Sequence, residues 1–330
     1  MQNKYRNIFL AFGFIAVLIM LFTFDMDYHD LWTNLKRAGI YLPLVLLLWL
    51  FVYLINTTSW YTIIRSGGKL GFPFVRLYKF TVTGFALNYV TPVGLMGGEP
   101  YRIMELKPYI GVERATSSVI LYVMMHIFSH LCFWLSSVIL YLFMYPIGWG
   151  MGLVLVAITV FCTFIVVLFT KGYQHGMAVA CLRLAKHIPF FKNRMVRFAE
   201  THQKQLADID RQIILLHKQK KRTFYTALLL EYTARVVSCL EIWLILSVLT
   251  THVSFLDCCL IAAFSSLLAN ILFFLPMQLG GREGGFALAV SSLYLSGAYG
   301  VYTALITRVR ELFWIVIGLL LMKIGNQSKA

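Results

Sequence analysis

Long uncharged runs of apolar residues, separated by short polar clusters, are the dominant pattern along this chain. Three such runs occupy residues 8–24, 38–64 and 115–170. A helix needs about 20 mostly apolar residues to cross the hydrocarbon core of a bilayer, so the first two runs each predict one membrane span. The third run is long enough for two spans, and the Pro- and Gly-containing segment 145–150 predicts a tight turn between them.

The C-terminal third of the chain has the same pattern, but charged residues interrupt its apolar segments. We predict spans at residues 223–250 and 302–322, with further apolar segments at 258–281 and 284–307. The charged residues inside the two spans are Glu231, Arg235, Glu241, Arg308, Arg310 and Glu311. An ionisable side chain costs on the order of 3 kcal/mol in hydrocarbon, so we expect these residues to face a cavity and to have partners.

Four of these charged residues form two pairs, and the members of each pair are spaced so that they can interact along the same helix. Glu231 and Arg235 are four residues apart, and Arg308 and Glu311 are three residues apart. Side chains at these spacings lie on the same face of a helix. We therefore expect each pair to form an ion pair along its own helix.

The composition is typical of a membrane protein and excludes a soluble domain. Of 330 residues, 59% are hydrophobic and 13% are charged, and the mean hydropathy is +0.75. Soluble domains have about 25% charged residues. The 29 Lys and Arg residues outnumber the 14 Asp and Glu residues, but the sequence has no nucleic-acid-binding motif, so we expect no nucleic-acid partner.

The placement of the basic residues indicates which loops face the cytoplasm. The cluster at 65–79 and the long polar segment 171–222 are both rich in Lys and Arg, as cytoplasmic loops are. Within the second, apolar residues recur at steps of three and four from Met195 to Leu216, which predicts a basic amphipathic helix that binds the membrane surface or a partner. We expect a multipass protein of the cell inner (plasma) membrane with both termini in the cytoplasm.

One short motif occurs twice in the chain. The first copy contains Asn88, Thr91, Pro92, Gly97, Gly98, Glu99 and Arg102. The second copy contains Asn270, Pro276, Gly280, Gly281, Arg282 and Glu283. Because Pro removes a backbone donor and Gly tolerates positive φ, each copy predicts a break in a helix beside a carboxylate. A structural kink without a function is the alternative interpretation of each copy.

The loop assignments determine how the two motifs enter the membrane. If the basic clusters are cytoplasmic, residues 80–114 must return to the cytoplasmic side, and residues 258–296 must return to the outer side. The predicted fold is therefore an all-α polytopic membrane protein, an inverted repeat with two opposed re-entrant, Pro/Gly-broken helical hairpins. We expect a single domain over residues 1–330, with repeat halves at about 38–145 and 223–323 and the basic connector 171–222.

The motifs and the charged spans together form the candidate binding site. We expect Glu99 and Glu283 to lie in one central cavity. The expected electropositive wall consists of Arg102, Arg235, Arg282, Arg308 and Arg310. Arginines and free helix N-termini suit an anionic head group. His126 and His130 have a spacing that metal ligands also use, but no third ligand is near them in sequence, so we expect no metal and no cofactor.

The two motifs resemble those of the lysylphosphatidylglycerol synthase transmembrane family, over about residues 42–322. In that family the best-known bifunctional members join a flippase part to a cytoplasmic aminoacyl-transferase domain, for which we expect no room in this chain. The resemblance therefore implies the flippase part alone. Such a protein binds a lipid with an anionic, phosphate-bearing head group and moves it between leaflets without covalent chemistry.

Two other functions stay open at this point. Asp25 and Asp27 follow the first predicted span, where membrane glycosyltransferases that use polyprenyl-phosphate sugars place functional carboxylates. The second alternative is an accessory subunit of a lipid-glycan pathway that transports nothing itself. The expected partner is a membrane phospholipid or a polyprenyl-linked lipid, and a homodimer is left open.

Overall fold

The described part of the chain is entirely helical. A computed structural model of residues 1–330 describes Thr33 and residues 36–69, 71–90, 97–175, 221–271 and 281–323, and these ranges contain no strand. The longer helices are α3 (Tyr41–Ser66), α6 (Val112–Met144), α7 (Trp149–His175), α11 (Lys221–Leu246) and α14 (Gly297–Leu321). The shorter ones are α4 (Phe74–Val90), α5 (Gly98–Ile110), α12 (Phe255–Ile271) and α13 (Gly281–Ser291). The all-α prediction is confirmed.

Among the described residues, three helices are long and apolar enough to cross a membrane. They are Tyr41–Ser66, Val112–Met144 and the Trp149–Val167 part of α7. The predicted turn at 145–150 is confirmed, because α6 ends at Met144 and α7 begins at Trp149. The predicted span at 8–24 and most of the connector 171–222 lie outside the described residues.

The helices α11 and α14 have the length of membrane spans but carry charges. They contain 26 and 25 residues, which corresponds to about 39 and 38 Å at 1.5 Å per residue. The helix α14 begins at Gly297, earlier than the predicted start at residue 302. Apolar surface alone therefore does not account for these two helices, and their charges must be paired within the bundle.

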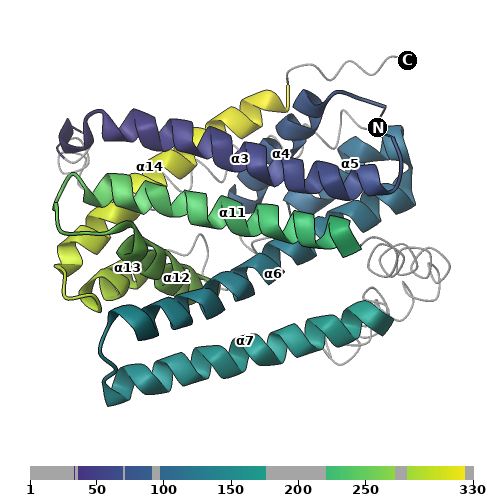
Figure 1. Ribbon diagram of the computed structural model, residues 1–330. Coiled ribbons are helices and arrows are strands. Elements are labelled where there is room, and N and C mark those ends of the chain that lie inside the picture. The colour runs from purple at the N-terminus through teal and green to yellow at the C-terminus, as the bar shows by residue number, and fades with distance from the viewer. Residues whose placement is uncertain are drawn as a thin grey trace, which may run out of the picture.

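The helices α3 and α11 lie side by side and run in opposite directions (Figure 1). Near the N-terminal part of α3, Trp49 Nε1 donates to Glu241 Oε2 at 2.8 Å. Near its C-terminal part, Ser59 Oγ donates to the carbonyl of Ala227 at 3.1 Å. These two bonds join the helices at two points along their length.

The two pairs of short helices lie toward opposite ends of the bundle. In Figure 1, α4 and α5 lie toward the end where α3 finishes and α6 begins, whereas α12 and α13 lie toward the end where α6 and α11 finish. The motif copies fall at the joins between α4 and α5 and between α12 and α13.

Two hydrophobic cores meet in the middle of α6 and α11. One core contains Tyr122 of α6 and Ala227 of α11 and joins them to α3, α4 and α5. The other contains Leu131 of α6 and Cys239 of α11 and joins them to α7, α12, α13 and α14. Polar residues of both helices lie at the junction between the two cores.

Candidate functional site

A cavity of about 300 Å³ lies at this junction. Helices α3, α4, α6, α11, α12, α13 and α14 all contribute to its wall. Its ionisable residues, apart from Tyr89, are His126, His130, Glu231, Arg235, Glu241, Arg282, Arg310 and Glu311. Its uncharged polar residues include Asn56, Ser238, Ser265, Ser266, Asn270 and Thr307, and its aromatic residues are Trp49, Phe85, Tyr89 and Phe286. A wall of this composition can bind a charged group in the middle of an apolar bundle.

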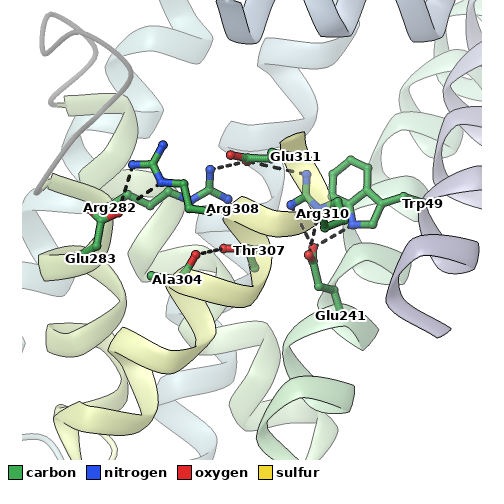
Figure 2. A network of polar contacts seen from close by, with 9 residues as sticks. All are labelled: Trp49, Glu241, Arg282, Glu283, Ala304, Thr307, Arg308, Arg310 and Glu311. Atoms are coloured by element: carbon green, nitrogen blue, oxygen red, sulfur yellow. Dashed lines mark hydrogen bonds and ion pairs between the residues drawn. The ribbon is translucent and has the colours of Figure 1, made fainter. Parts of the chain in front are cut away.

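Arg310 of α14 connects three helices across the cavity wall (Figure 2). Its Nε and Nη2 donate to the two carboxylate oxygens of Glu241 at 2.9 and 3.2 Å. Its guanidinium carbon lies 3.8 Å from the centre of the Trp49 ring. Because Trp49 also donates to Glu241, these three side chains tie α14, α11 and α3 together.

Two further ion pairs join α13 to α14. Arg282 donates to Glu311, and Arg308 Nη2 lies 3.1 Å from Glu283 Oε1. Figure 2 shows both pairs on the α13 side of the Arg310 network. The predicted ion pair between Arg308 and Glu311 is wrong. Arg308 pairs with Glu283 of α13, and Glu311 pairs with Arg282 and Arg310. Cross-helix neighbours lie closer than the neighbour one turn away.

A second polar cluster joins α6 to α11. His126 Nδ1 lies 2.8 Å from Glu231 Oε2. Arg235 donates from Nε to Ser129 Oγ at 2.8 Å and from Nη2 to the carbonyl of His126 at 2.9 Å. The predicted ion pair between Glu231 and Arg235 is therefore wrong, since both side chains bond to α6 instead. Within the described ranges, no carboxylate lies within salt-bridge distance of Arg235.

The first motif joins α4 to α5 through Asn88. The amide N–H of Gly98 donates to Asn88 Oδ1 at 2.8 Å, and Asn88 Nδ2 donates to Glu99 Oε1 at 2.9 Å. A Cβ atom on Gly98 would lie 2.1 Å from the carbonyl oxygen of Gly84, so only glycine allows this approach of the two helices. Asn88 thus satisfies an N-terminal amide of α5 and the motif carboxylate together.

Arg102 is enclosed in the first core and does not reach the cavity wall. It is 1% exposed, and its Nη1 lies 3.4 Å from Glu99 Oε1. Its guanidinium carbon lies 5.6, 4.8 and 5.1 Å from the ring centres of Trp60, Phe85 and Tyr122. Cation–π contacts of this kind stabilise a desolvated guanidinium by about 2 kcal/mol.

The second motif is built differently. Asn270 donates to the carbonyl of Ser266 within its own helix at 2.8 Å, so it does not bind the motif glutamate as Asn88 does. The cavity wall includes Asn270 and Arg282 but neither Glu99 nor Glu283 among the residues described, in contrast to the expected shared cavity. Gly97 precedes α5 and Gly281 begins α13. The motif residues outside the described ranges are Thr91, Pro92, Pro276 and Gly280.

Some wall residues were not predicted from the sequence. Trp49, Tyr89 and Phe286 are aromatic residues in apolar segments, which gives no signal that separates them from core residues. Asn56 gave a signal that could have been used, because it is an amide inside a long apolar span. In the described ranges, no three His, Cys, Asp or Glu side chains form a group suited to a metal ion.

Comparison with known proteins identifies the family. No curated protein and no solved structure matches the chain. The family described as lysylphosphatidylglycerol synthase TM region matches residues 8–318. With the three apolar helices, this match indicates a membrane protein with a lipid-related function. The chain belongs to the family of lysylphosphatidylglycerol synthase transmembrane regions.

Proposed function

We propose that the protein binds the anionic, phosphate-bearing head group of a membrane lipid in the central cavity and moves the lipid between leaflets. The observation that supports this proposal most directly is Arg235. Its guanidinium lies on the cavity wall and has no carboxylate within salt-bridge distance in the described ranges. An arginine fork matches the geometry of a phosphate group, and it binds phosphate best where water is scarce.

The volume of the cavity suits a lipid head group but is too small for a whole lipid. About 300 Å³ is at the small end of ligand pockets, so the acyl chains would stay in the surrounding bilayer. Serine and asparagine side chains from α11 and α12 provide hydrogen-bonding groups beside Arg235. The head group would thus exchange its water for protein groups when it enters the bundle.

The proposed movement uses the two pairs of short helices. In this proposal, α4–α5 and α12–α13 are opposed re-entrant hairpins of an inverted repeat, with halves at about 38–145 and 223–323. They rock against the long helices and open the cavity to one leaflet at a time. Both termini and the connector 171–222 then face the cytoplasm, and the protein lies in the inner membrane.

Lipid movement in reconstituted vesicles tests the proposal. The probe is fluorescent phosphatidylglycerol, whose exposure is read by quenching with a membrane-impermeant reductant. We expect Arg235→Gln to lower the rate about 10- to 150-fold, because a hydrogen bond to a charged group contributes about 1.5–3 kcal/mol. The matched control is Arg222→Gln, which changes an exposed arginine at the start of the same helix and should keep the parent rate. Equal rates for the parent and Arg235→Gln would contradict the proposal.

The glycosyltransferase alternative predicts a different order of effects. Asp25 and Asp27, on which it depends, lie outside the described residues. An enzyme of that kind would be inactivated by Asp25→Asn and Asp27→Asn, whereas a flippase would be more sensitive to Glu283→Gln. Complementation of a deletion strain by these variants distinguishes the two. An accessory subunit would bind the fluorescent lipid without moving it.

A further inference from the structure

The geometry points to the His126–Glu231 pair as a proton-binding site that takes up one proton when an anionic head group binds at Arg235. This inference rests on the proposed function and adds a second ligand, the proton, to the same cavity. It starts from the charges of the wall. Three glutamates (231, 241 and 311) face three arginines (235, 282 and 310) there, so with neutral histidines the formal charges of the described wall cancel.

A bound anion disturbs this balance. A phosphodiester head group adds one negative charge to a site surrounded by apolar helices, where a net charge is far more costly than in water. One proton restores the balance. Outside the wall, Glu99 pairs with Arg102 and Glu283 with Arg308, so the carboxylates of both motifs already have cationic partners.

The three wall carboxylates differ in their readiness to accept a proton. Glu241 accepts two hydrogen bonds from Arg310 and one from Trp49. Glu311 accepts from Arg282 and also faces Arg310. Glu231 is 1% exposed, its Oε2 contacts His126, and its Oε1 has no hydrogen-bond partner in the described structure. A proton is therefore accommodated at Glu231 and its histidine with the least loss of existing bonds.

His126 gives the pair access to the cavity. Both side chains belong to the wall, but that of His126 is 27% exposed and that of Glu231 only 1%. A proton that arrives through the cavity can bind the imidazole and be shared with the carboxylate at 2.8 Å. Intramembrane pairs of this type are the usual components of proton pathways.

The surroundings of His126 couple the proton to the anion. The ionisable groups that face its ring are Glu231 and Arg235 from α11, Arg102 from α5, and Tyr122 and His130 from its own helix. Of the described residues of α4, Phe85 contacts the ring. The two arginines oppose a positive charge on the ring, and an anion bound at Arg235 removes part of that opposition. By linkage, the anion then strengthens proton binding and the proton strengthens anion binding by the same factor.

The coupling can be measured by calorimetry on the purified protein. The probe is dioctanoyl phosphatidylglycerol, because its phosphodiester does not change charge near neutral pH. Titrations in two buffers of different ionisation enthalpy give the number of protons taken up per lipid. We expect about one proton per lipid, and a dissociation constant that rises about tenfold per pH unit above the midpoint of the pair.

Variants assign the proton to the pair. Glu231→Gln removes one negative charge from the wall, so lipid binding should proceed without proton uptake and with an affinity that does not depend on pH. The matched control is Glu113→Gln, an exposed carboxyl at the start of α6, which should keep the parent's proton uptake and pH dependence. If Glu231→Gln does not fold, His126→Gln is used, and the pH dependence of lipid affinity should differ from that of the parent because the imidazole that shares the proton with Glu231 is missing. An unchanged pH dependence would contradict the assignment to this pair.

The outcomes separate this inference from the proposed function. Lipid binding with no proton uptake and a constant affinity would overturn the proton site and leave the head-group site intact. Full proton uptake by Glu231→Gln would overturn the assignment to this pair. Failure of the parent protein to bind the lipid at any pH would overturn the proposed function, and the proton site with it.

Discussion

Replacing Arg310 by methionine tests whether the buried ion network holds α3, α11 and α14 together. The guanidinium is 2% exposed, and its bidentate bonds to Glu241 are 2.9 and 3.2 Å long. Methionine has a similar length and no charge, so Arg310→Met removes the network with little change in packing volume. It leaves Glu241 in an apolar bundle with the Trp49 N–H as its remaining donor among those described.

The expected loss of stability follows from this arrangement. Removing one partner of a buried ion pair destabilises a protein by about 3–5 kcal/mol, because the other charge stays buried and unpaired. Since Trp49 still donates to Glu241 and the cavity lies beside it, we expect the lower end, about 3 kcal/mol. The double variant Arg310→Met/Glu241→Gln carries no unpaired charge and should regain at least about 2 kcal/mol.

Unfolding of the purified protein in detergent measures both values. A thiol-reactive dye reports unfolding, because Cys162, Cys239, Cys258 and Cys259 are buried in the folded chain. The control Arg222→Met changes an exposed arginine and should alter the free energy of unfolding by less than about 0.5 kcal/mol. The single variant Glu241→Gln completes the comparison. Strictly additive effects of Arg310→Met and Glu241→Gln would refute the reasoning, since they would mean that the pair contributes no coupling energy.

Two further predictions concern helix packing and topology. Gly98→Ala should destabilise the protein by at least about 2 kcal/mol, because the new Cβ would lie 2.1 Å from the carbonyl oxygen of Gly84. The matched control is Gly284→Ala, whose new Cβ would have no atom within 4 Å, so this variant should be neutral or stabilising in the same assay. In a cysteine-free protein, Ile147→Cys should react with an impermeant thiol reagent from outside intact cells and Arg222→Cys only after permeabilisation. Labelling of both from the same side would contradict the proposed topology.

Hydropathy predicted the long helices well but not every boundary within them. The turn between α6 and α7 was found because Pro and Gly interrupt a run that is too long for one span. The start of α14 was placed too late, because residues 284–307 carry no charge and charge placement therefore does not mark the break between α13 and α14. In the structure that break contains Tyr294 with a positive φ of 62°. Hydropathy does not detect a local backbone conformation of this kind.

The sequence identified most charged residues of the site but not their partners. Spacing along a helix shows only that two side chains share a face, and it gives no information on what lies opposite. Glu231 bonds to His126 on another helix, and Glu311 bonds to Arg282 on another helix, because packing brings these groups closer than the predicted neighbours one turn away. Such pairings depend on the register of helices far apart in sequence, which local periodicity cannot specify.

The two motif copies differ in whether their ion pairs reach the rest of the bundle. Glu99 contacts Asn88 of α4 and Arg102 of α5, so these two polar contacts of the carboxylate stay within its own pair of short helices. In the second copy, Arg282 and Glu283 each pair with α14, and α14 is tied to α11 and α3 through Arg310. A movement of α13 against α14 must therefore break ion pairs, whereas a joint movement of α4 and α5 leaves their ion pair intact but breaks the contacts of Arg102 with Trp60 of α3 and Tyr122 of α6. If the head group competes with Glu311 for Arg282, lipid binding itself would loosen the contact of α13 with α14. In the proposed mechanism, α4–α5 and α12–α13 would then not open with equal ease.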